Sequence, residues 1–262
     1  MPISMLRPAV LVENKNGSYG SGTVIFSARI SSTVVQEKEG VVKKIRRQIP
    51  HRYVLTNLHV VEDSILFCYR KKRAHALGRT KSAHEKWTVR RLPLTVTAFE
   101  FGADIRSLKK TKYTADIVAC DKEHDLALLR LRTGSNLNHV AHLAPRESAL
   151  ELLRPVWAVG CPLEVNPFLT DGRIGGTDEG GRTMRMLSSN PIYSGNSGGP
   201  LYIFSEERKR HEVIGVVTSV GHDANAPVSH TAYSIPIKKV WDFLEKSGYG
   251  FITKQKTEKI AE

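Results

Sequence analysis

The sequence predicts an all-β protein, and three observations support this fold class. Short runs rich in β-branched and aromatic residues recur along the 262 residues, and turn-forming residues separate them. The chain lacks the regular alternation of strand and helix patterns that a parallel α/β sheet requires. A single helix is expected, over residues 236–248, where Ile237, Val240 and Leu244 share one face.

Strand patterns fill the first half of the chain. The turn-forming tetrapeptide Asn14–Gly17 joins the first two, and an inserted β-hairpin with its tip at 36–40 is expected over residues 30–48. A buried strand is expected after Asp125, where an apolar run follows. The other expected strands of this half lie at residues 9–13, 18–28, 53–55, 64–70, 87–92, 94–99 and 114–120.

The second half begins with a polar connection over residues 133–155, rich in Asn, Pro and charged residues. Glycine is dense from Gly172 to Gly181, and we expect a mobile segment there. A charged hairpin turn is expected over residues 205–211. The expected strands of this half lie at residues 156–162, 182–187, 201–204, 213–219 and 232–236.

Positive charge is concentrated between residues 70 and 112. The whole chain has a formal net charge of +13, and its most basic run is Arg70–Lys81. Such a run attracts nucleic acid or acidic partners, whereas a solvated loop is the simpler interpretation. The aromatic residues nearby are too scattered to indicate base stacking.

Cysteine spacing and hydropathy bear on disulfides, metal sites and the cellular location of the protein. Cys68, Cys120 and Cys161 lack the spacing of a disulfide framework or a zinc site, so we expect small buried side chains. The histidines show no metal-ligand spacing, so neither a metal nor a cofactor is expected. The N-terminus lacks a signal-peptide pattern and no segment approaches membrane-spanning length, so we expect a cytoplasmic protein without a membrane partner.

The most informative stretch is Gly195–Pro200, in which glycines surround Ser197. Glycine lets the backbone adopt conformations that a Cβ opposes, and it lets a substrate approach closely. A serine hydroxyl is a poor nucleophile until a base accepts its proton. The loop alone is therefore equally typical of a flexible surface loop.

Two further stretches offer a base and an orienting acid. His59 follows the β-prone run that starts at Tyr53, and Asp125 opens an apolar run. A catalytic triad needs a histidine that accepts the serine proton and a carboxylate that fixes its tautomer. His59, Asp125 and Ser197 are therefore the candidate catalytic residues. A core histidine and a turn aspartate are the alternatives, and the neighbouring His124 is expected at the surface.

Three motifs in chain order, T-N-x-H-V-V, D-L-A-L-L and G-N-S-G-G-P-L, resemble those of the chymotrypsin-fold (trypsin-like) serine peptidases. The bacterial HtrA/Deg-like protease domain is the most similar branch. Gly20-Ser-Gly-Thr also resembles a strand of that branch, while Cys161 replaces its usual Asn. The chain ends too soon for the PDZ domain that many HtrA proteins carry, so none is expected.

The resemblance implies two six-stranded antiparallel β-barrels with a C-terminal helix and the site between the barrels. His59 and Asp125 would come from the first barrel and Ser197 from the second. The implied division is a first barrel over residues 1–135 with basic insertions near 30–50 and 70–112, a second barrel with the helix over 136–249, and a polar tail over 250–262.

The same resemblance assigns further roles. The backbone N–H groups of Gly195 and Ser197 would form the oxyanion hole, and Pro191, Thr218 and Ser219 would contact the substrate. Pro191 occupies a position where enzymes that prefer Lys or Arg carry an acid, so a small or medium apolar residue is expected at P1. Asn196 replaces an aspartate that pairs with a newly cut N-terminus in digestive relatives, which predicts activity without zymogen cleavage.

The predicted function is a serine endopeptidase that acts on protein or peptide substrates through an acyl-enzyme intermediate. The alternative is a catalytically latent protein of this fold that binds nucleic acid or an acidic partner through the basic insertion. The serine loop also fits the G-x-S-x-G nucleophile elbow of α/β-hydrolases, but residues 201–204 favour a strand where that elbow needs a helix. The oligomeric state is not encoded in any of these patterns.

Overall fold

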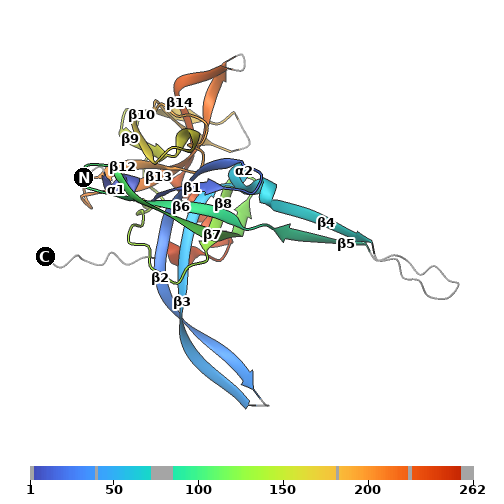
Figure 1. Ribbon diagram of the computed structural model, residues 1–262. Coiled ribbons are helices and arrows are strands. Elements are labelled where there is room, and N and C mark those ends of the chain that lie inside the picture. The colour runs from blue at the N-terminus through green and yellow to red at the C-terminus, as the bar shows by residue number, and fades with distance from the viewer. Residues whose placement is uncertain (1–2, 39–40, 72–84, 181–182, 224–225, 255–262) are drawn as a thin grey trace.

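The computed structural model describes residues 3–38, 41–71, 85–180, 183–223 and 226–254. The chain forms two closed antiparallel barrels of six strands each, with a two-stranded sheet beside them (Figure 1). The predicted all-β fold class is therefore confirmed, including the number of strands in each barrel.

The first barrel is built around small branched side chains. Residues such as Val10, Val12, Val54, Val96 and Leu129 alternate inward and are fully buried, as the two-residue period of a half-buried strand requires. The order around this barrel is β1 (Ala9–Glu13), β2 (Tyr19–Lys38), β3 (Val41–Asn57), β8 (Leu126–Leu131), β7 (Ser107–Asp121) and β6 (Leu94–Phe101).

The second barrel follows along the chain and packs against the first. One buried cluster contains Phe26 and Leu55 of the first barrel together with Val216 and Ile235 of the second, so the two barrels share a continuous core. The order around the second barrel is β10 (Phe168–Asp178), β11 (Arg185–Ser188), β14 (Ala226–Pro236), β13 (Arg210–Asp223), β12 (Pro200–Ser205) and β9 (Pro155–Gly160).

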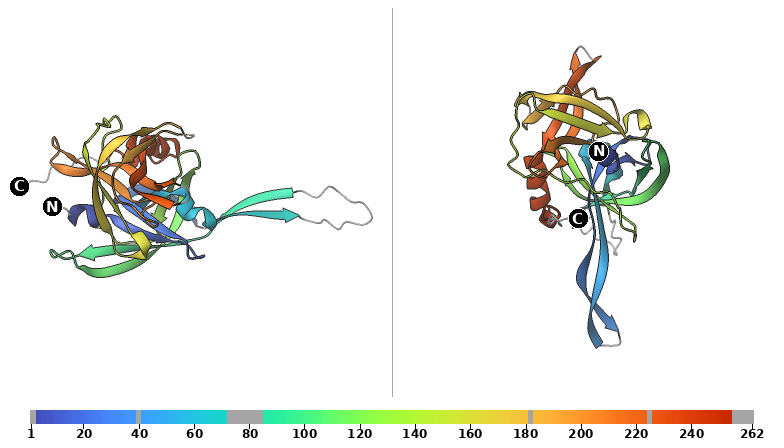
Figure 2. Two further views of the ribbon diagram at one scale, coloured as in Figure 1. Left: turned by 90° about the horizontal axis from the view of Figure 1, so that it is seen from above. Right: turned by 90° about the vertical axis from the view of Figure 1, so that its left-hand side faces the viewer.

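Two hairpins extend beyond the barrels (Figures 1 and 2). The expected insertion before the histidine is present, since β2 and β3 stay paired as far as Lys38 and Val41. The second hairpin consists of β4 (Ile65–Lys71) and β5 (Glu85–Arg91). Most of the basic run Arg70–Lys81 lies outside the described residues, so its predicted role stays untested.

Helices are few. The predicted C-terminal helix is present as α3 (Ile237–Lys246), which buries Ile237, Val240 and Leu244. Two four-residue helices were not predicted, α1 (Ile3–Leu6) and α2 (Leu58–Val61), and three short 3-10 turns lie at Glu62–Ser64, Pro162–Glu164 and Gly250–Ile252. None of the helices in the described ranges is long and apolar enough to cross a bilayer.

Three local expectations need correction. Residues 172–178, expected to be a mobile segment, belong to β10 and pair with β9 and β11, because ladder hydrogen bonds outweigh the low strand propensity of glycine. His124, expected at the surface, is 6% exposed. Cys161 is buried as predicted, but Cys120 is only half-buried; the side chain of Cys68 lies outside the described residues.

The connection between the barrels is tied to the first barrel by Arg52 of β3. Arg52 is fully buried; its Nε donates to the Ser135 carbonyl at 2.7 Å and its Nη1 to the Ala28 carbonyl at 2.9 Å. Its Nη2 donates to the Asn136 side chain. The predicted boundary between the units, at residue 135, falls inside this connection and remains a prediction.

We expect Arg52→Met to lower the free energy of unfolding by roughly 2–4 kcal/mol, because it leaves buried carbonyl groups without their charged donor. Urea unfolding at neutral pH measures this change. Arg132→Met is the matched control: Arg132 is exposed and pairs with Asp116 at the surface, so its loss should cost much less. Equal destabilisation by the two variants would contradict the role given to Arg52.

Candidate active site

The structure brings His59 and Asp125 together across a strand end. β3 ends at Asn57, and the chain turns into α2, which carries His59. The Asn57 side chain and the Leu58 N–H both donate to the Asp125 carbonyl, at 2.9 and 3.1 Å. Asp125 itself has a φ of 55°, a left-handed conformation that Asp tolerates better than most residues. These contacts hold Asp125 next to the turn that carries His59.

The carboxylate of Asp125 orients the imidazole. One oxygen accepts the backbone N–H of His59 at 2.9 Å, and the other lies 2.7 Å from His59 Nδ1. With Nδ1 donating its proton to the carboxylate, Nε2 is left as the basic nitrogen. The Thr218 hydroxyl, from the second barrel, also donates to this carboxylate at 3.0 Å. The geometry is that of a base held in one tautomer.

Ser197 lies in the loop before β12, and the first barrel holds this loop. The Ser21 N–H donates to the Ser197 carbonyl at 2.7 Å, and the Gly198 N–H donates to the Val217 carbonyl at 2.8 Å. Gly198 has a φ of 88°, and a Cβ there would lie closer than 3.0 Å to Ser21 O and Thr56 Oγ1. Only glycine allows this approach without a shift of β2.

The Ser197 hydroxyl is directed at the Thr218 carbonyl, to which it donates at 2.8 Å. No hydrogen bond joins it to His59 within the described residues. Thr218 lies at an irregularity in the pairing of β13 with β14, which leaves its carbonyl free for this contact. A rotation of the serine side chain is therefore needed before His59 Nε2 can accept its proton.

Two backbone N–H groups beside the candidate nucleophile, those of Gly195 and Ser197, are the predicted oxyanion-hole donors. The Ser194 carbonyl accepts the Leu163 N–H at 3.1 Å, and the Ser21 hydroxyl donates to the Gly195 carbonyl at 2.6 Å. Because N–H and C=O of a trans peptide point in opposite directions, the Gly195 N–H faces away from Leu163. Neither this N–H nor that of Ser197 has an acceptor among the described residues.

An apolar pocket of about 420 Å³ opens next to the serine. Thr218 and Ser219, both predicted to contact substrate, line it together with Ser197. Pro191 does not; it lines a neighbouring pocket with Trp157 and Asp171, whereas Ile192 faces this one. Among the described residues no charged side chain lines the pocket, whose remaining lining residues are Leu163, Tyr193, Ser194 and Val220.

Two functional positions were missed from the sequence. Ser21 is fully buried, and its hydroxyl bridges the Gly195 carbonyl and the Cys161 N–H, the latter at 2.7 Å. Leu163 holds the Ser194 peptide. The G-S-G-T motif was the available signal for Ser21; no pattern marked Leu163.

A group of possible metal ligands, Asp121, Glu123 and His124, lies within the described residues. The hydrogen bonds among these three residues are those of a chain turn. Asp121 accepts the backbone N–H groups of Glu123 and His124 at 2.9 and 3.2 Å and lies 2.7 Å from His124 Nδ1. This turn sets the direction from which the chain reaches Asp125.

Comparison with known proteins places this geometry in a family. A chain described as the serine endoprotease from Yersinia pestis has a similar crystal structure, with a TM-score of 0.58 and 18% sequence identity. The match covers 97% of the present chain but 65% of that one, and at this identity it shows the fold. A search of curated proteins finds no match.

The family comparison is more direct. The model of the trypsin-like peptidase domain matches residues 39–216, a range that includes β3 through the first half of β13 and all three residues of the candidate triad. The chain therefore belongs to the trypsin-like peptidase domain family, within the chymotrypsin-fold serine peptidases.

Proposed function

We propose that the protein is a serine endopeptidase in which Ser197 is the nucleophile, His59 the general base and Asp125 the residue that orients it. The observation that carries the proposal is the hydrogen-bonded chain from Thr218 through Asp125 to His59. It lies next to a serine whose own N–H, like that of Gly195, has no acceptor among the described residues. An orienting carboxylate, a base of fixed tautomer and a preorganised oxyanion hole are what acyl transfer requires.

The reaction begins when Ser197 leaves the Thr218 carbonyl. A substrate that lies extended along β13 presents a backbone N–H to that carbonyl, which replaces the serine hydroxyl as donor. The freed hydroxyl then turns to His59 Nε2. Substrate binding and nucleophile activation are thereby coupled through one acceptor atom.

The chemical steps follow from the positions of the groups. Ser197 Oγ attacks the scissile carbonyl carbon as its proton passes to His59 Nε2, and the carbonyl oxygen gains negative charge between the N–H groups of Gly195 and Ser197. Each such donor is worth roughly 3 kcal/mol of barrier. His59 gives its proton to the leaving amine, and a water molecule then hydrolyses the acyl-enzyme by the same steps.

The first test is labelling by a fluorophosphonate probe, which reacts with activated serines. We expect the uncut chain to be labelled and Ser197→Ala to be unlabelled, because Ser197 is the serine that His59 would activate. Labelling of the uncut chain also tests the expectation that Asn196, an amide, needs no ion pair with a new N-terminus. Unlabelled but folded wild-type protein would favour the latent binding protein.

Substrate preference is the second test. We expect peptides with Ala, Val or Leu at P1 to be cleaved with a kcat/KM at least about 100-fold above peptides with Lys or Arg, because a charge entering the pocket beside Ile192 finds no partner. Matched peptides that differ only at P1 provide the measurement. A preference for Lys or Arg would contradict the assignment of this pocket.

Thr218 provides the third test. Thr218→Val removes the hydroxyl that donates to Asp125 but keeps the size of the side chain, and we expect kcat/KM to fall about tenfold. Thr218→Ser retains the hydroxyl and should recover most of the activity. If both variants lose activity equally, packing rather than the hydrogen bond is responsible.

A further inference from the structure

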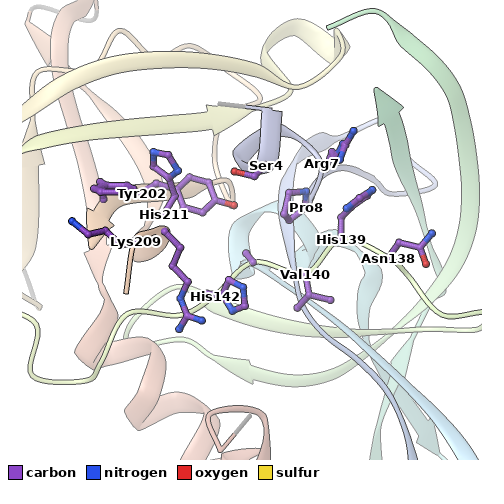
Figure 3. A pocket seen from close by; sticks show the side chains of 13 residues that line it. Ser4, Arg7, Pro8, Asn138, His139, Val140, His142, Tyr202, Lys209 and His211 are labelled. Carbon is purple, nitrogen blue, oxygen red and sulfur yellow. The ribbon is translucent and has the colours of Figure 1, made fainter. Parts of the chain in front are cut away.

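A second pocket, of about 300 Å³, lies where three parts of the chain meet. Its walls come from α1 and the segment that follows it, the connection between the barrels and the hairpin of β12 and β13 (Figure 3). It shares no residue with the apolar pocket beside Ser197. Six of its lining residues are basic, and none of the described lining residues is Asp or Glu: Arg7, His139, His142, Lys209, Arg210 and His211.

Acidic side chains outside the pocket neutralise part of its positive charge. Lys209, for example, pairs with Glu206 at 3.0 Å. Arg210 pairs with the buried Glu212 at 2.9 Å, but Glu212 also binds Arg208 at 2.7 Å, so one carboxylate serves two guanidinium groups. Arg7 donates to the Phe101 carbonyl at 3.3 Å, while its buried Nε has no acceptor among the described residues. Of the three permanent cations that line the pocket, Arg7 therefore has no ion pair among the described residues, and Arg210 shares its carboxylate with Arg208.

Tyr202 supplies an independent observation. Its side chain is 2% exposed and lines the pocket, yet its hydroxyl has no hydrogen-bond partner among the described residues. Figure 3 shows the phenol directed between Ser4 and the basic side chains. A buried hydroxyl without a partner is costly, and a small movement of the side chains that cover it would let an acceptor in the pocket satisfy it.

The three histidines are held neutral by their surroundings. Desolvation and the Arg7 charge lower the pKa of His139, against the opposing effect of Glu100. Desolvation and the Arg210 charge lower the pKa of His142, against Glu212. Burial lowers the pKa of His211, which packs on Trp157 and Phe204. An anion would reverse this balance, because it favours the protonated imidazole.

We propose that this pocket binds a small phosphate-type oxyanion. Guanidinium, ammonium, imidazole and phenol groups all donate hydrogen bonds, and a phosphate oxyanion is rich in acceptors. The planar guanidinium of Arg7 suits two oxygens of one phosphate. Since the ligand would contact the N-terminal segment, the connection and the second barrel together, binding should stabilise the junction of the two barrels.

The pH dependence has a definite sign. In the absence of an anion the histidine pKa values are lowered, so the imidazoles are neutral above those values. A bound anion raises them, so binding takes up protons and becomes tighter as pH falls. For each proton taken up, affinity rises about tenfold per pH unit.

The test uses the full chain carrying Ser197→Ala, so that its outcome does not depend on proteolysis. Sulfate serves as the probe because its charge stays constant in this pH range, and calorimetric titration measures its affinity. We expect saturable binding that is at least about tenfold tighter near pH 6 than near pH 8. Absence of saturable binding, or affinity independent of pH, would overturn the proposal.

Variants locate the site. Arg7→Gln should weaken sulfate binding about tenfold or more, whereas Arg132→Gln, which makes the same change in net charge at the exposed pair with Asp116, should not. Equal effects of the two would mean that binding is nonspecific. Tyr202→Phe removes only the unpartnered hydroxyl, so it should weaken binding severalfold without lowering Tm; unchanged affinity would remove Tyr202 from the site.

Two further titrations distinguish the sources of the phosphate group. Inorganic phosphate and glycerol phosphate present the same oxyanion, and only the second carries an ester substituent. Tighter binding of glycerol phosphate would identify an organic phosphomonoester as the ligand class, and tighter binding of inorganic phosphate would identify the free ion. Failure of both to compete with sulfate would overturn the assignment to phosphate.

Discussion

The geometry of the nucleophile loop depends on the hydrogen bonds of one buried serine, Ser21 of β2. Its hydroxyl donates to the Gly195 carbonyl and accepts the Cys161 N–H, while its N–H donates to the Ser197 carbonyl. Its own carbonyl accepts the Thr56 hydroxyl at 2.6 Å. One residue of the first barrel therefore sets the position of a loop that belongs to the second. Such a fully satisfied buried network is rigid, because each broken bond would leave a buried group unpaired.

The same arrangement explains why the loop is rich in glycine. Gly195 and Gly198 both have positive φ, and a Cβ at either would lie closer than 3.0 Å to neighbouring atoms. At Gly198 those atoms belong to Ser21 and Thr56. The hydrogen bonds of Ser21 hold the loop so close to the first barrel that only a residue without a Cβ fits there. Thr218 adds a bond in the reverse direction, from the second barrel to Asp125 of the first. The candidate triad is thus assembled only when both barrels are in place.

These long-range contacts mark the limit of what the sequence predicts. The helix α3 and the candidate residues His59, Asp125 and Ser197 follow from local patterns, whereas the two-barrel architecture was implied by the resemblance of three motifs to those of a known family. The roles of Ser21 and Leu163 do not, because their partners lie far away in the chain and no spacing encodes them. The strand through Gly172 to Asp178 was missed for a related reason: its stability comes from pairing with β9 and β11 rather than from its own residues. The burial of His124 likewise follows from its bond to Asp121.

The net charge of +13 does not act in the same way on every part of the protein. Its effect on the pocket beside Ser197 differs from its effect on the pocket of Arg7 and His139. The pocket beside Ser197 carries no charged side chain, so charge cannot select the residue that enters it. The net positive charge instead affects how fast a negatively charged partner meets the protein. Salt screens this attraction over about 8 Å at physiological ionic strength. In the pocket of Arg7 and His139, by contrast, charged side chains line the cavity itself. The proposed substrate preference and the proposed anion binding would therefore depend on different residues and respond differently to salt and to pH.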